Sequence, residues 1–260
     1  MIALPVLLGL LARFTLAAAV PANESGLIFG YFFAFSADDG DAASFTNEED
    51  GNYAIQWEAN SGHFIGGAGW NPGSAQSISY STFSPVGNSW FSIYGWTTDP
   101  LVEYRILEEN FGGVDPTVGL TSKGSLTSDG SVYNIYEAQI FNGVSPVGTA
   151  NFSQYWSIRQ SPVTAGVPTV TTQNHFTAWA AAGMPLGEFG YQIVATEQAG
   201  GASASTEAGS LSVLVRTRPG GFCATEFAQC GGEGFTGPTC CVSNTTCVQD
   251  NQFFSTCVAD

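Results

Sequence analysis

Between residues 28 and 215, short stretches dense in aromatic and β-branched residues alternate with clusters of Gly, Pro, Asn and Asp. Stretches of this kind, bounded by turn-forming residues, are typical of β-strands. The pattern therefore predicts a domain made mostly of strands. Its clearest strands are residues 53–57 (YAIQW), 77–81 (SISYS), 90–94 (WFSIY), 132–136 (VYNIY) and 154–158 (QYWSI).

Many of these stretches place aromatic residues at both odd and even positions. An antiparallel sheet with one solvated face should instead alternate apolar and polar residues. Aromatic side chains on the open face suit a different purpose, because their rings stack on the apolar faces of sugars. We therefore expect a concave sheet that binds carbohydrate.

One segment, residues 173–183 (QNHFTAWAAAG), departs from this pattern. It is rich in Ala, and Phe176, Trp179 and Ala180 follow the three- and four-residue spacing of a helix face. We therefore expect one short helix. Many strands with a single helix predict an all-β fold, namely a two-sheet jelly roll.

The charge balance excludes some classes of function. Six Lys and Arg against 22 Asp and Glu give a net charge of −16, which repels nucleic acid and anionic membranes. No motif indicates a metal or nucleotide cofactor, and we expect none. We interpret the acidic pair Glu108 and Glu109 and the Asp-rich residues 38–41 as solvated turns, because the spacing of a calcium site is incomplete.

The first twenty residues indicate export. They are apolar and end in Ala17-Ala18-Ala19, a small-residue pattern that signal peptidases accept. Arg13 interrupts the run, which argues against a membrane anchor. We predict that residues 1–19 are a signal peptide and that the protein is secreted.

All six cysteines lie between Cys223 and Cys257. So many cysteines in so short a segment predict a disulfide-rich knot, here residues 223–258, in place of a large core. Six cysteines allow about fifteen pairings. A zinc site is the alternative, but oxidising export argues against it. Residues 216–222 form an unusually short linker to the predicted strand domain, residues 28–215.

The tail contains QCGGEGFTGPTCC, residues 229–241, and NQFFSTC, residues 251–257. With these two motifs, the tail resembles the family 1 carbohydrate-binding modules, which fungal enzymes use to hold cellulose. The resemblance implies the pairings Cys223–Cys240, Cys230–Cys247 and Cys241–Cys257. It also implies a cellulose-binding face formed by Phe227, Phe253, Phe254 and Asn251. The alternative is that these phenylalanines form the small core of the knot.

The strand domain resembles the family 11 glycoside hydrolases, jelly-roll endo-β-1,4-xylanases. The resemblance covers nearly the whole domain. Its motifs are residues 62–73 (GHFIGGAGWNPG), 94–96 (YGW), 100–104 (PLVEY), 127–131 (TSDGS), 155–159 (YWSIR), 174–176 (NHF) with 178–179 (AW), and 191–197 (YQIVATE).

The resemblance implies that Glu103 is the nucleophile and Glu197 the acid/base of a retaining mechanism. Retention requires carboxyl groups about 5–5.5 Å apart, and two such groups cannot ionise equally easily, so we expect the pKa of Glu197 to rise. Strand geometry supports the role of Glu103. It shares one face with Arg105, whereas the apolar Val102 and Tyr104 occupy the other. The alternative is that both glutamates are ordinary surface carboxylates.

Three further residues match family positions that donate hydrogen bonds to sugar and carboxylates: Tyr94, Gln154 and Tyr191. His63 stands where the family usually has Asn or Asp beside the acid/base. A protonated His63 would favour the carboxylate form of Glu197. The alternative is that it is a partly exposed loop histidine. We interpret Tyr155 and Trp156 as core aromatic residues.

The chain departs from the family in the cleft. Ser36 replaces a sugar-stacking Trp, Ile140 replaces an Arg, and residues 144–146 (VSP) alter the thumb tip. Ala199 replaces an aromatic residue, and Arg105 replaces a Tyr two residues after the nucleophile. Arg105 should either hold Glu103 in an ion pair or bind an acidic substituent of xylan.

These observations predict a secreted, monomeric endo-β-1,4-xylanase that acts on xylan and is anchored to cellulose by its tail. The alternative is a catalytically weak or inactive protein that binds plant cell walls or acts as an elicitor. A β-1,4-glucanase with the same fold fits the quoted motifs less well.

Overall fold

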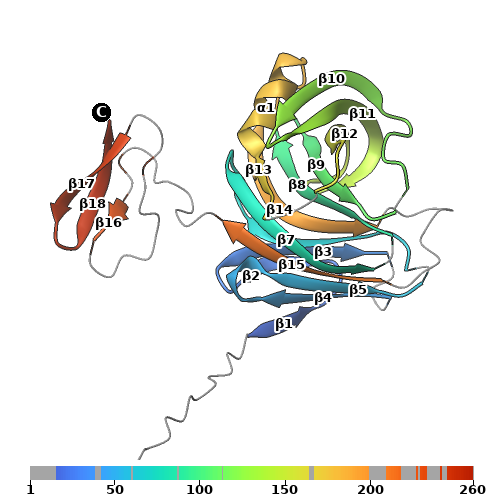
Figure 1. Cartoon of the computed structure of the whole chain (residues 1–260), viewed down its shortest axis with the longest axis horizontal. Helices are drawn as coiled ribbons and strands as arrows, with labels where there is room; N and C mark the ends of the chain where they lie inside the picture. The colour runs from blue at the N-terminus through green and yellow to red at the C-terminus, as the bar shows by residue number, and fades with distance from the viewer. Residues whose placement is uncertain are drawn as a thin grey trace, which may run out of the picture.

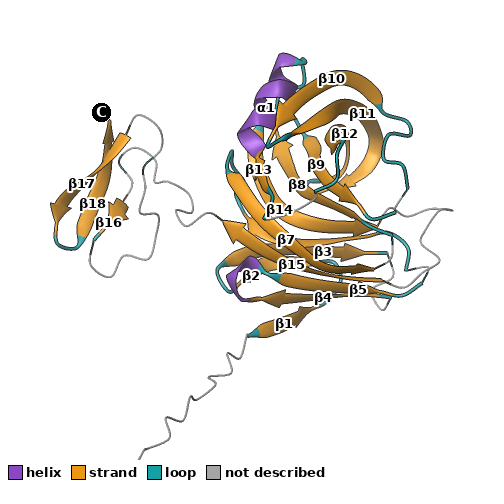
Figure 2. Ribbon diagram, viewed as in Figure 1, coloured by secondary structure: helices purple, strands orange, loops and turns teal. Residues whose placement is uncertain are grey.

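The computed structural model describes residues 16–38, 42–59, 61–86, 88–112, 114–163, 167–198, 209–217, 227, 229–232, 241 and 245–259. These residues form three β-sheets and one α-helix (Figures 1 and 2). Two of the sheets pack face to face as a jelly roll, and the third belongs to the cysteine-rich tail. The predicted all-β fold with a single short helix is confirmed.

The first sheet has the strand order β1-β4-β5-β15-β7-β13. Its strands are β1 (Ala17–Val20), β4 (Ala43–Glu48), β5 (Tyr53–Trp57), β15 (Gly209–Thr217), β7 (Ser77–Val86) and β13 (Thr169–Thr171). A short 3-10 helix, η1 (Glu49–Gly51), joins β4 to β5. The predicted cleavage point after Ala19 falls inside β1, so a chain processed there would keep only Val20 of this strand.

The second sheet has the order β10-β11-β12-β9-β8-β14-β6-β3-β2 and carries most of the motifs described above, whereas residues 174–176 and 178–179 lie in the helix. Its strands are β10 (Thr121–Ser128), β11 (Ser131–Ser145), β12 (Gly148–Arg159), β9 (Val102–Asn110), β8 (Trp90–Thr98), β14 (Glu188–Gln198), β6 (Phe64–Trp70), β3 (Tyr31–Ala37) and β2 (Glu24–Ile28). Most neighbours are antiparallel, but β12 runs parallel to β9.

The core lies between these two sheets. Alternation along β9 shows how the sequence builds it: Val102, Tyr104 and Ile106 are fully buried in the main apolar cluster, as predicted. The residues between them face the opposite side of the sheet. Packing against the first sheet therefore decides which side chains of β9 remain available for chemistry.

The helix α1 (Thr172–Ala181) covers one end of the core (Figure 1). It buries Phe176 and Trp179 against Tyr104, with ring centroids 5.5 and 5.9 Å away. It ends two residues before the predicted boundary, because Gly183 adopts a positive φ of 78° there. Within the described ranges, no helix has the length and apolar character needed to span a bilayer.

The prediction that Glu108 lies in a solvated turn is wrong. β9 continues to Asn110, so Glu108 lies on the core side of the strand, as Tyr104 and Ile106 do. Its residue surface is 2% exposed. Its carboxylate accepts hydrogen bonds from the hydroxyls of Tyr80 at 3.0 Å and Tyr133 at 2.6 Å, and from Arg159 Nη1 at 3.0 Å. These contacts neutralise and satisfy the buried charge. Glu109 accepts a hydrogen bond from the Val163 N–H.

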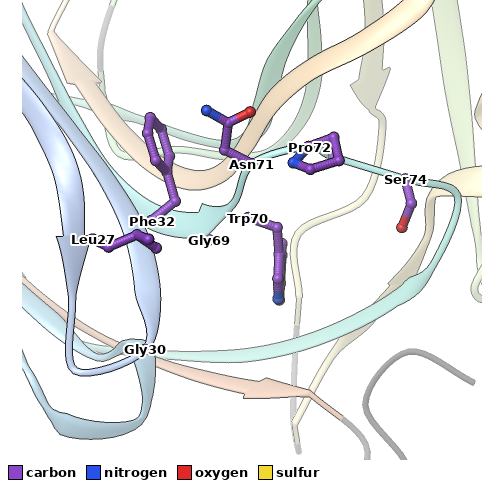
Figure 3. A pocket seen from close by; sticks show the side chains of 9 residues that line it. Leu27, Gly30, Phe32, Gly69, Trp70, Asn71, Pro72 and Ser74 are labelled. Carbon is purple, nitrogen blue, oxygen red and sulfur yellow. The ribbon is translucent and has the colours of Figure 1, made fainter. Parts of the chain in front are cut away.

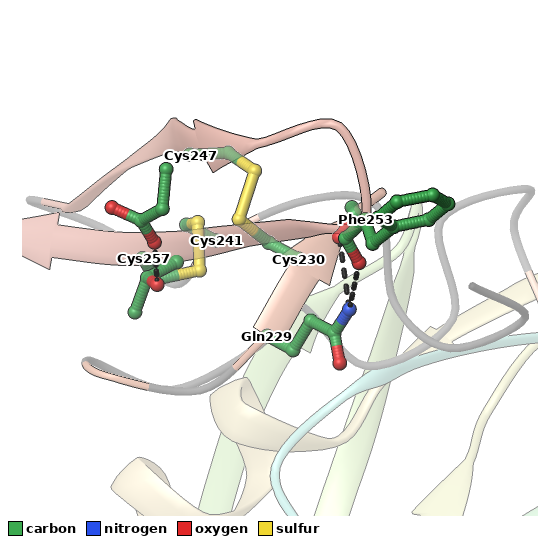
Figure 4. The surroundings of a disulfide bond; sticks show 9 residues. Gln229, Cys230, Cys241, Cys247, Phe253 and Cys257 are labelled. Atoms are coloured by element: carbon green, nitrogen blue, oxygen red, sulfur yellow. Dashed lines mark hydrogen bonds between the residues drawn. A yellow bond between two sulfur atoms is a disulfide. The ribbon is translucent and has the colours of Figure 1, made fainter. Parts of the chain in front are cut away.

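The tail forms a three-stranded sheet of β16 (Gln229–Gly231), β18 (Phe254–Ala259) and β17 (Thr245–Asn251). Two of the predicted disulfides, Cys230–Cys247 and Cys241–Cys257, are present (Figure 4). The third predicted pair, Cys223–Cys240, lies outside the described residues. β15 extends to Thr217, two residues into the predicted linker, and residues 218–222 lie outside the described part.

Candidate active site

A cleft lies over the face of the second sheet that turns away from the core. Strands β6, β8, β9, β11, β12 and β14 and the segment before β10 contribute to it. Its polar residues are His63, Tyr94, Glu103, Arg105, Asp115, Gln154 and Glu197. Its apolar wall consists of Ile65, Trp90, Val114, Pro116, Val118, Leu120, Ile140, Val144, Phe152 and Trp156. Six of the seven predicted xylan-site residues therefore line one cleft.

Strand register brings the donors to Glu103. Gln154 is opposite Glu103 in the β12–β9 pair, and Tyr94 reaches it from β8. The Tyr94 hydroxyl donates to Glu103 Oε1 at 2.7 Å, and Gln154 Nε2 donates to Oε2 at 2.5 Å. Trp96 Nε1 in turn donates to the Tyr94 hydroxyl at 2.7 Å. Both oxygens of this buried carboxylate are thus held by neutral donors.

Arg105 lies between the two glutamates. Its Nε donates to Glu197 Oε2 at 2.7 Å, and its Nη2 donates to Glu197 Oε1 at 2.8 Å. The same Nη2 donates to Glu103 Oε1 at 3.1 Å. The predicted ion pair with Glu103 is present, and the bidentate contact, which the sequence did not predict, belongs to Glu197. Which carboxylate accepts two hydrogen bonds from the guanidinium depends on the register of strands β14, β8 and β9, which the sequence does not reveal.

The expected rise in the pKa of Glu197 is not found. Burial works to raise this pKa, but the charge of Arg105, the hydrogen bond from His63 and the hydrogen bonds from Arg105 lower it to about 2. The prediction rested on repulsion between two carboxylates and did not place Arg105 against Glu197. A cation placed between them removes that repulsion and stabilises the ionised form.

His63 lies beside Glu197, as predicted, with 3.3 Å between Nε2 and Oε1. Its backbone exchanges contacts with Asp38: the His63 N–H donates to Asp38 Oδ2 at 3.2 Å, and the Asp38 N–H donates to the His63 carbonyl at 2.9 Å. The hydrogen bond to Glu197 raises the pKa of His63, and burial partly opposes this. A proton on His63 therefore further favours the Glu197 carboxylate.

Tyr191 is one step removed from the carboxylates. Its ring packs near Tyr94 and Phe32, with centroid distances of 6.0 and 5.4 Å. Burial is the main reason that its pKa rises to about 12, so the phenol stays protonated at any physiological pH. The structure places this predicted donor beside Tyr94 and outside the lining of the cleft.

Tyr155 and Trp156 are both buried in apolar clusters, as predicted. Trp156 lines the cleft, and its ring lies 4.8 Å from the Arg105 guanidinium carbon. Tyr94 lies at the same distance from that carbon. Because Trp156 is two residues from Gln154, the period of two along a strand already placed both on one face.

The other family departures have plain structural consequences. Ser36 is exposed and donates to Asn23 Oδ1 at 2.9 Å, so no aromatic platform stands there. Ile140 and Val144 line the cleft, and Val144 is 86% exposed. Ala199 lies outside the described residues. The apolar wall thus offers few polar partners to a sugar chain.

A second, smaller pocket lies where the β2–β3 hairpin meets the segment after β6 (Figure 3). In the view of Figure 3, the side chains of Phe32 and Asn71 point upward and those of Trp70 and Ser74 point downward. None of the predicted site residues lines it. Phe32 also packs near Tyr191, whose ring in turn packs near Tyr94 of the main cleft.

In the tail, the predicted cellulose-binding residues are exposed: Phe227 by 73%, Phe253 by 62% and Phe254 by 39%. They do not form the core of the knot, where the buried residues are Cys230 and Cys257. Asn251 Oδ1 accepts the Phe253 N–H at 2.9 Å, and Gln229 Nε2 donates to the Phe253 carbonyl at 3.1 Å (Figure 4). All cysteines that the structure describes are in disulfides, which excludes them as zinc ligands.

Comparisons with known proteins agree with this geometry. Ethylene-inducing xylanase 1 of Botryotinia fuckeliana (strain B05.10) is 45% identical over 251 residues, covering 91% of this chain and 88% of its own length. Endo-1,4-beta-xylanase B of Phanerodontia chrysosporium is 47% identical over 251 residues, covering 88% of this chain and 85% of its own length.

One similar solved structure is described as "Structural comparison of two major endo-1,4-beta-xylanases from Trichodrema reesei". It has a TM-score of 0.57 and 35% sequence identity to this chain, and the match covers 79% of this chain and 98% of that chain. A family model of the fungal cellulose binding domain matches residues 226–254. A model of the glycosyl hydrolases family 11 matches residues 29–208, which is more than half of the chain. The protein therefore belongs to the glycosyl hydrolases family 11 and carries a fungal cellulose binding domain in its tail.

Proposed function

We propose that this protein is a secreted endo-β-1,4-xylanase that hydrolyses xylan with retention of configuration and is held on cellulose by its tail. The observation that carries the proposal is the pair of buried carboxylates, Glu103 and Glu197, which face each other across one guanidinium in a single cleft. Relatives named as xylanases support the choice of substrate.

The separation of the carboxylates supports retention. Arg105 Nη2 lies 3.1 Å from Glu103 Oε1 and 2.8 Å from Glu197 Oε1, so these two oxygens are at most about 6 Å apart, near the roughly 5–5.5 Å of retaining enzymes and below the 6.5–9.5 Å of inverting ones. A water molecule has no room between sugar and carboxylate at this spacing, so the carboxylate itself attacks.

The roles of the two residues follow from their partners. Glu103, oriented by Tyr94 and Gln154, attacks the anomeric carbon. Glu197 delivers a proton to the leaving oxygen through an oxocarbenium-like transition state. The sugar is then covalently bound to Glu103. In the second step Glu197 accepts a proton from water, and that water releases the sugar.

The tail supports attachment to cellulose. Phe227, Phe253 and Phe254 expose their rings, and aromatic rings stack on the apolar faces of glucose units. Cellulose and xylan lie together in plant cell walls, so an anchor raises the local concentration of the cleft near its substrate. Export through the predicted signal peptide, and action as a monomer, complete the proposal.

One observation favours a second candidate, a cell-wall-binding protein or elicitor with little activity. Arg105 neutralises the acid/base and lowers its pKa. Several relatives are named ethylene-inducing xylanases, a name that describes an effect besides hydrolysis. The presence of both glutamates with their donors supports the enzyme over this candidate.

The test is the release of reducing sugar from glucuronoxylan, arabinoxylan and carboxymethyl-cellulose by the secreted protein and its Glu103→Gln variant. We expect xylan hydrolysis that the variant lacks, with the β-anomer formed first by NMR. If the wild type releases no more sugar than the variant on any substrate while it still binds cellulose, the second candidate is correct.

A further inference from the structure

We propose that Arg105 restrains turnover: by joining Glu103 and Glu197 in one hydrogen-bonded ion triplet, it slows hydrolysis. This inference rests on the proposed hydrolase function. It assigns to Arg105 the role of a positioning residue that sets the protonation of the acid/base.

The contacts leave little freedom to the triplet. Arg105, Glu103 and Glu197 are 5%, 6% and 3% exposed. Nε and Nη2 make three charge-assisted hydrogen bonds of 2.7, 2.8 and 3.1 Å. Such bonds are about twice as strong as neutral ones, and the fork fixes the orientation of the Glu197 carboxylate.

Two aromatic rings hold the guanidinium in place. Its central carbon lies 4.8 Å from the ring centres of both Tyr94 and Trp156. Cation–π attraction is strongest where water is excluded, as in this buried site. Movement of Arg105 out of the cleft would forfeit both ring contacts and remove the guanidinium that the two carboxylates share. We therefore regard it as a fixed part of the site.

The fixed cation opposes proton delivery. The titratable and charged groups near Glu197 are His63 before β6, Tyr94 on β8, and Arg105 and Glu103 on β9. Two of these groups can carry positive charge, and only Glu103 carries negative charge. Without Arg105, the nearby Glu103 carboxylate would favour the protonated form of Glu197 that the first chemical step requires.

The experiment compares wild-type protein with Arg105→Tyr and Arg105→Gln, and uses Arg105→Lys as the matched control. Lysine keeps a positive charge but lacks the planar fork. On soluble xylan at pH 6, we expect kcat to rise at least tenfold in the first two variants and less in Arg105→Lys. The alkaline limb of the kcat/KM profile should move upward by at least one pH unit, which a merely structural role would not cause.

A second measurement uses the wild type alone. Glu197 can be titrated by NMR of ¹³C-labelled glutamate carboxyls, with assignment from Glu197→Gln. Titration of Glu197 below pH 4 supports the inference, and titration at pH 4 or above overturns it, whether or not the variants fold. Folded Arg105 variants with unchanged alkaline limbs and lower kcat also overturn it.

The same series separates this inference from the proposed function. If the wild type is active, Glu103→Gln is inactive and the Arg105 variants are slower than the wild type, the inference fails and the proposed function stands. If wild type and all variants release no sugar, the hydrolase function itself fails. Activity that appears only after Arg105 is replaced would support both.

Discussion

Two ion clusters lie on opposite faces of the same strand, β9. Toward the cleft, Glu103 and Arg105 meet Glu197 and Tyr94. Toward the core, Glu108 meets Arg159 with the hydroxyls of Tyr80 and Tyr133. Each cluster combines carboxylate, guanidinium and phenol, and in each the arginine lies over a tyrosine ring.

The clusters differ in how completely their charges are matched. The core cluster has one carboxylate for one guanidinium, and two phenols complete its hydrogen bonds. The cleft cluster has two carboxylates for one guanidinium, and Arg105 Nη1 remains without a partner among the described residues. A fully satisfied buried cluster contributes to stability, whereas an incompletely satisfied one at an open cleft is suited to bind and react. The predictions below test this difference.

The largest effect is expected from Glu103→Gln in the cleft cluster. Loss of the nucleophile should reduce xylan hydrolysis by at least about a thousandfold. The melting temperature should change little, because glutamine preserves the shape and can still meet Gln154. Initial rates and thermal unfolding of the same preparations test this. A large loss of stability with residual activity above one-tenth would show that Glu103 is structural.

Glu108→Ala should have the reverse outcome. Removal of one partner from a buried pair leaves Arg159 uncompensated, and the free energy of unfolding should fall by about 3–5 kcal/mol. The activity per folded molecule should remain near wild type, because Glu108 does not face the cleft. Urea unfolding monitored by tryptophan fluorescence measures the first quantity. A loss below about 1 kcal/mol would contradict the view of this cluster as structural.

His175, beside the core cluster, should make stability depend on pH. It is fully buried, packs edge-on to Tyr133, and its ring nitrogens have no partners among the described residues. Burial is the main reason that its pKa falls to about 4, from an ordinary value of 6.5. The unfolded chain therefore binds the proton more readily, and stability is lost as the pH falls from about 6.5 toward 4.

The contribution of His175 to this loss should approach about 3 kcal/mol. His175→Phe cannot bind a proton and should lose correspondingly less stability between pH 7 and pH 4. Denaturant unfolding at both pH values gives the comparison. Equal losses in the two proteins would refute the role of His175.

His63 acts in the opposite sense, because its raised pKa stabilises the fold at low pH and this contribution disappears as the pH rises.

The smallest effect is expected at the exposed rim. Lys123 Nζ lies 2.6 Å from Glu137 Oε2, with both side chains partly exposed. Solvent weakens such pairs, so Lys123→Met should change the free energy of unfolding by less than about 1 kcal/mol. This variant is also the control for Glu108→Ala. If both lower stability equally, burial does not distinguish the clusters.

Much of the fold could be predicted from local pattern. The stretch 53–57 coincides with β5, and the other four quoted stretches lie inside β7, β8, β11 and β12. The helix was placed within two residues at its C-terminal end. These predictions succeed because period, turn residues and Ala content are local properties of the chain.

Errors arose where a residue's environment comes from distant segments. Glu108 was interpreted as a turn residue because it is charged and adjacent to another glutamate, although strand alternation from Val102 placed it toward the core. Tyr80, Tyr133 and Arg159 make that burial possible, and they lie on three other strands. The cleft contact of Trp156 was missed, although its spacing of two residues from Gln154 placed both side chains on one face of β12.

Residue order alone gave the family resemblance, the disulfide-rich tail, the faces of β9 and the prediction that Glu103 and Glu197 act together, because motif and alternation are local to the chain. The folded arrangement of strands was needed to see that Arg105 donates two hydrogen bonds to Glu197 and lowers the pKa of that residue to about 2. The difference is one of distance. An ion pair depends on a few ångströms between atoms on different strands, and strand register sets that spacing.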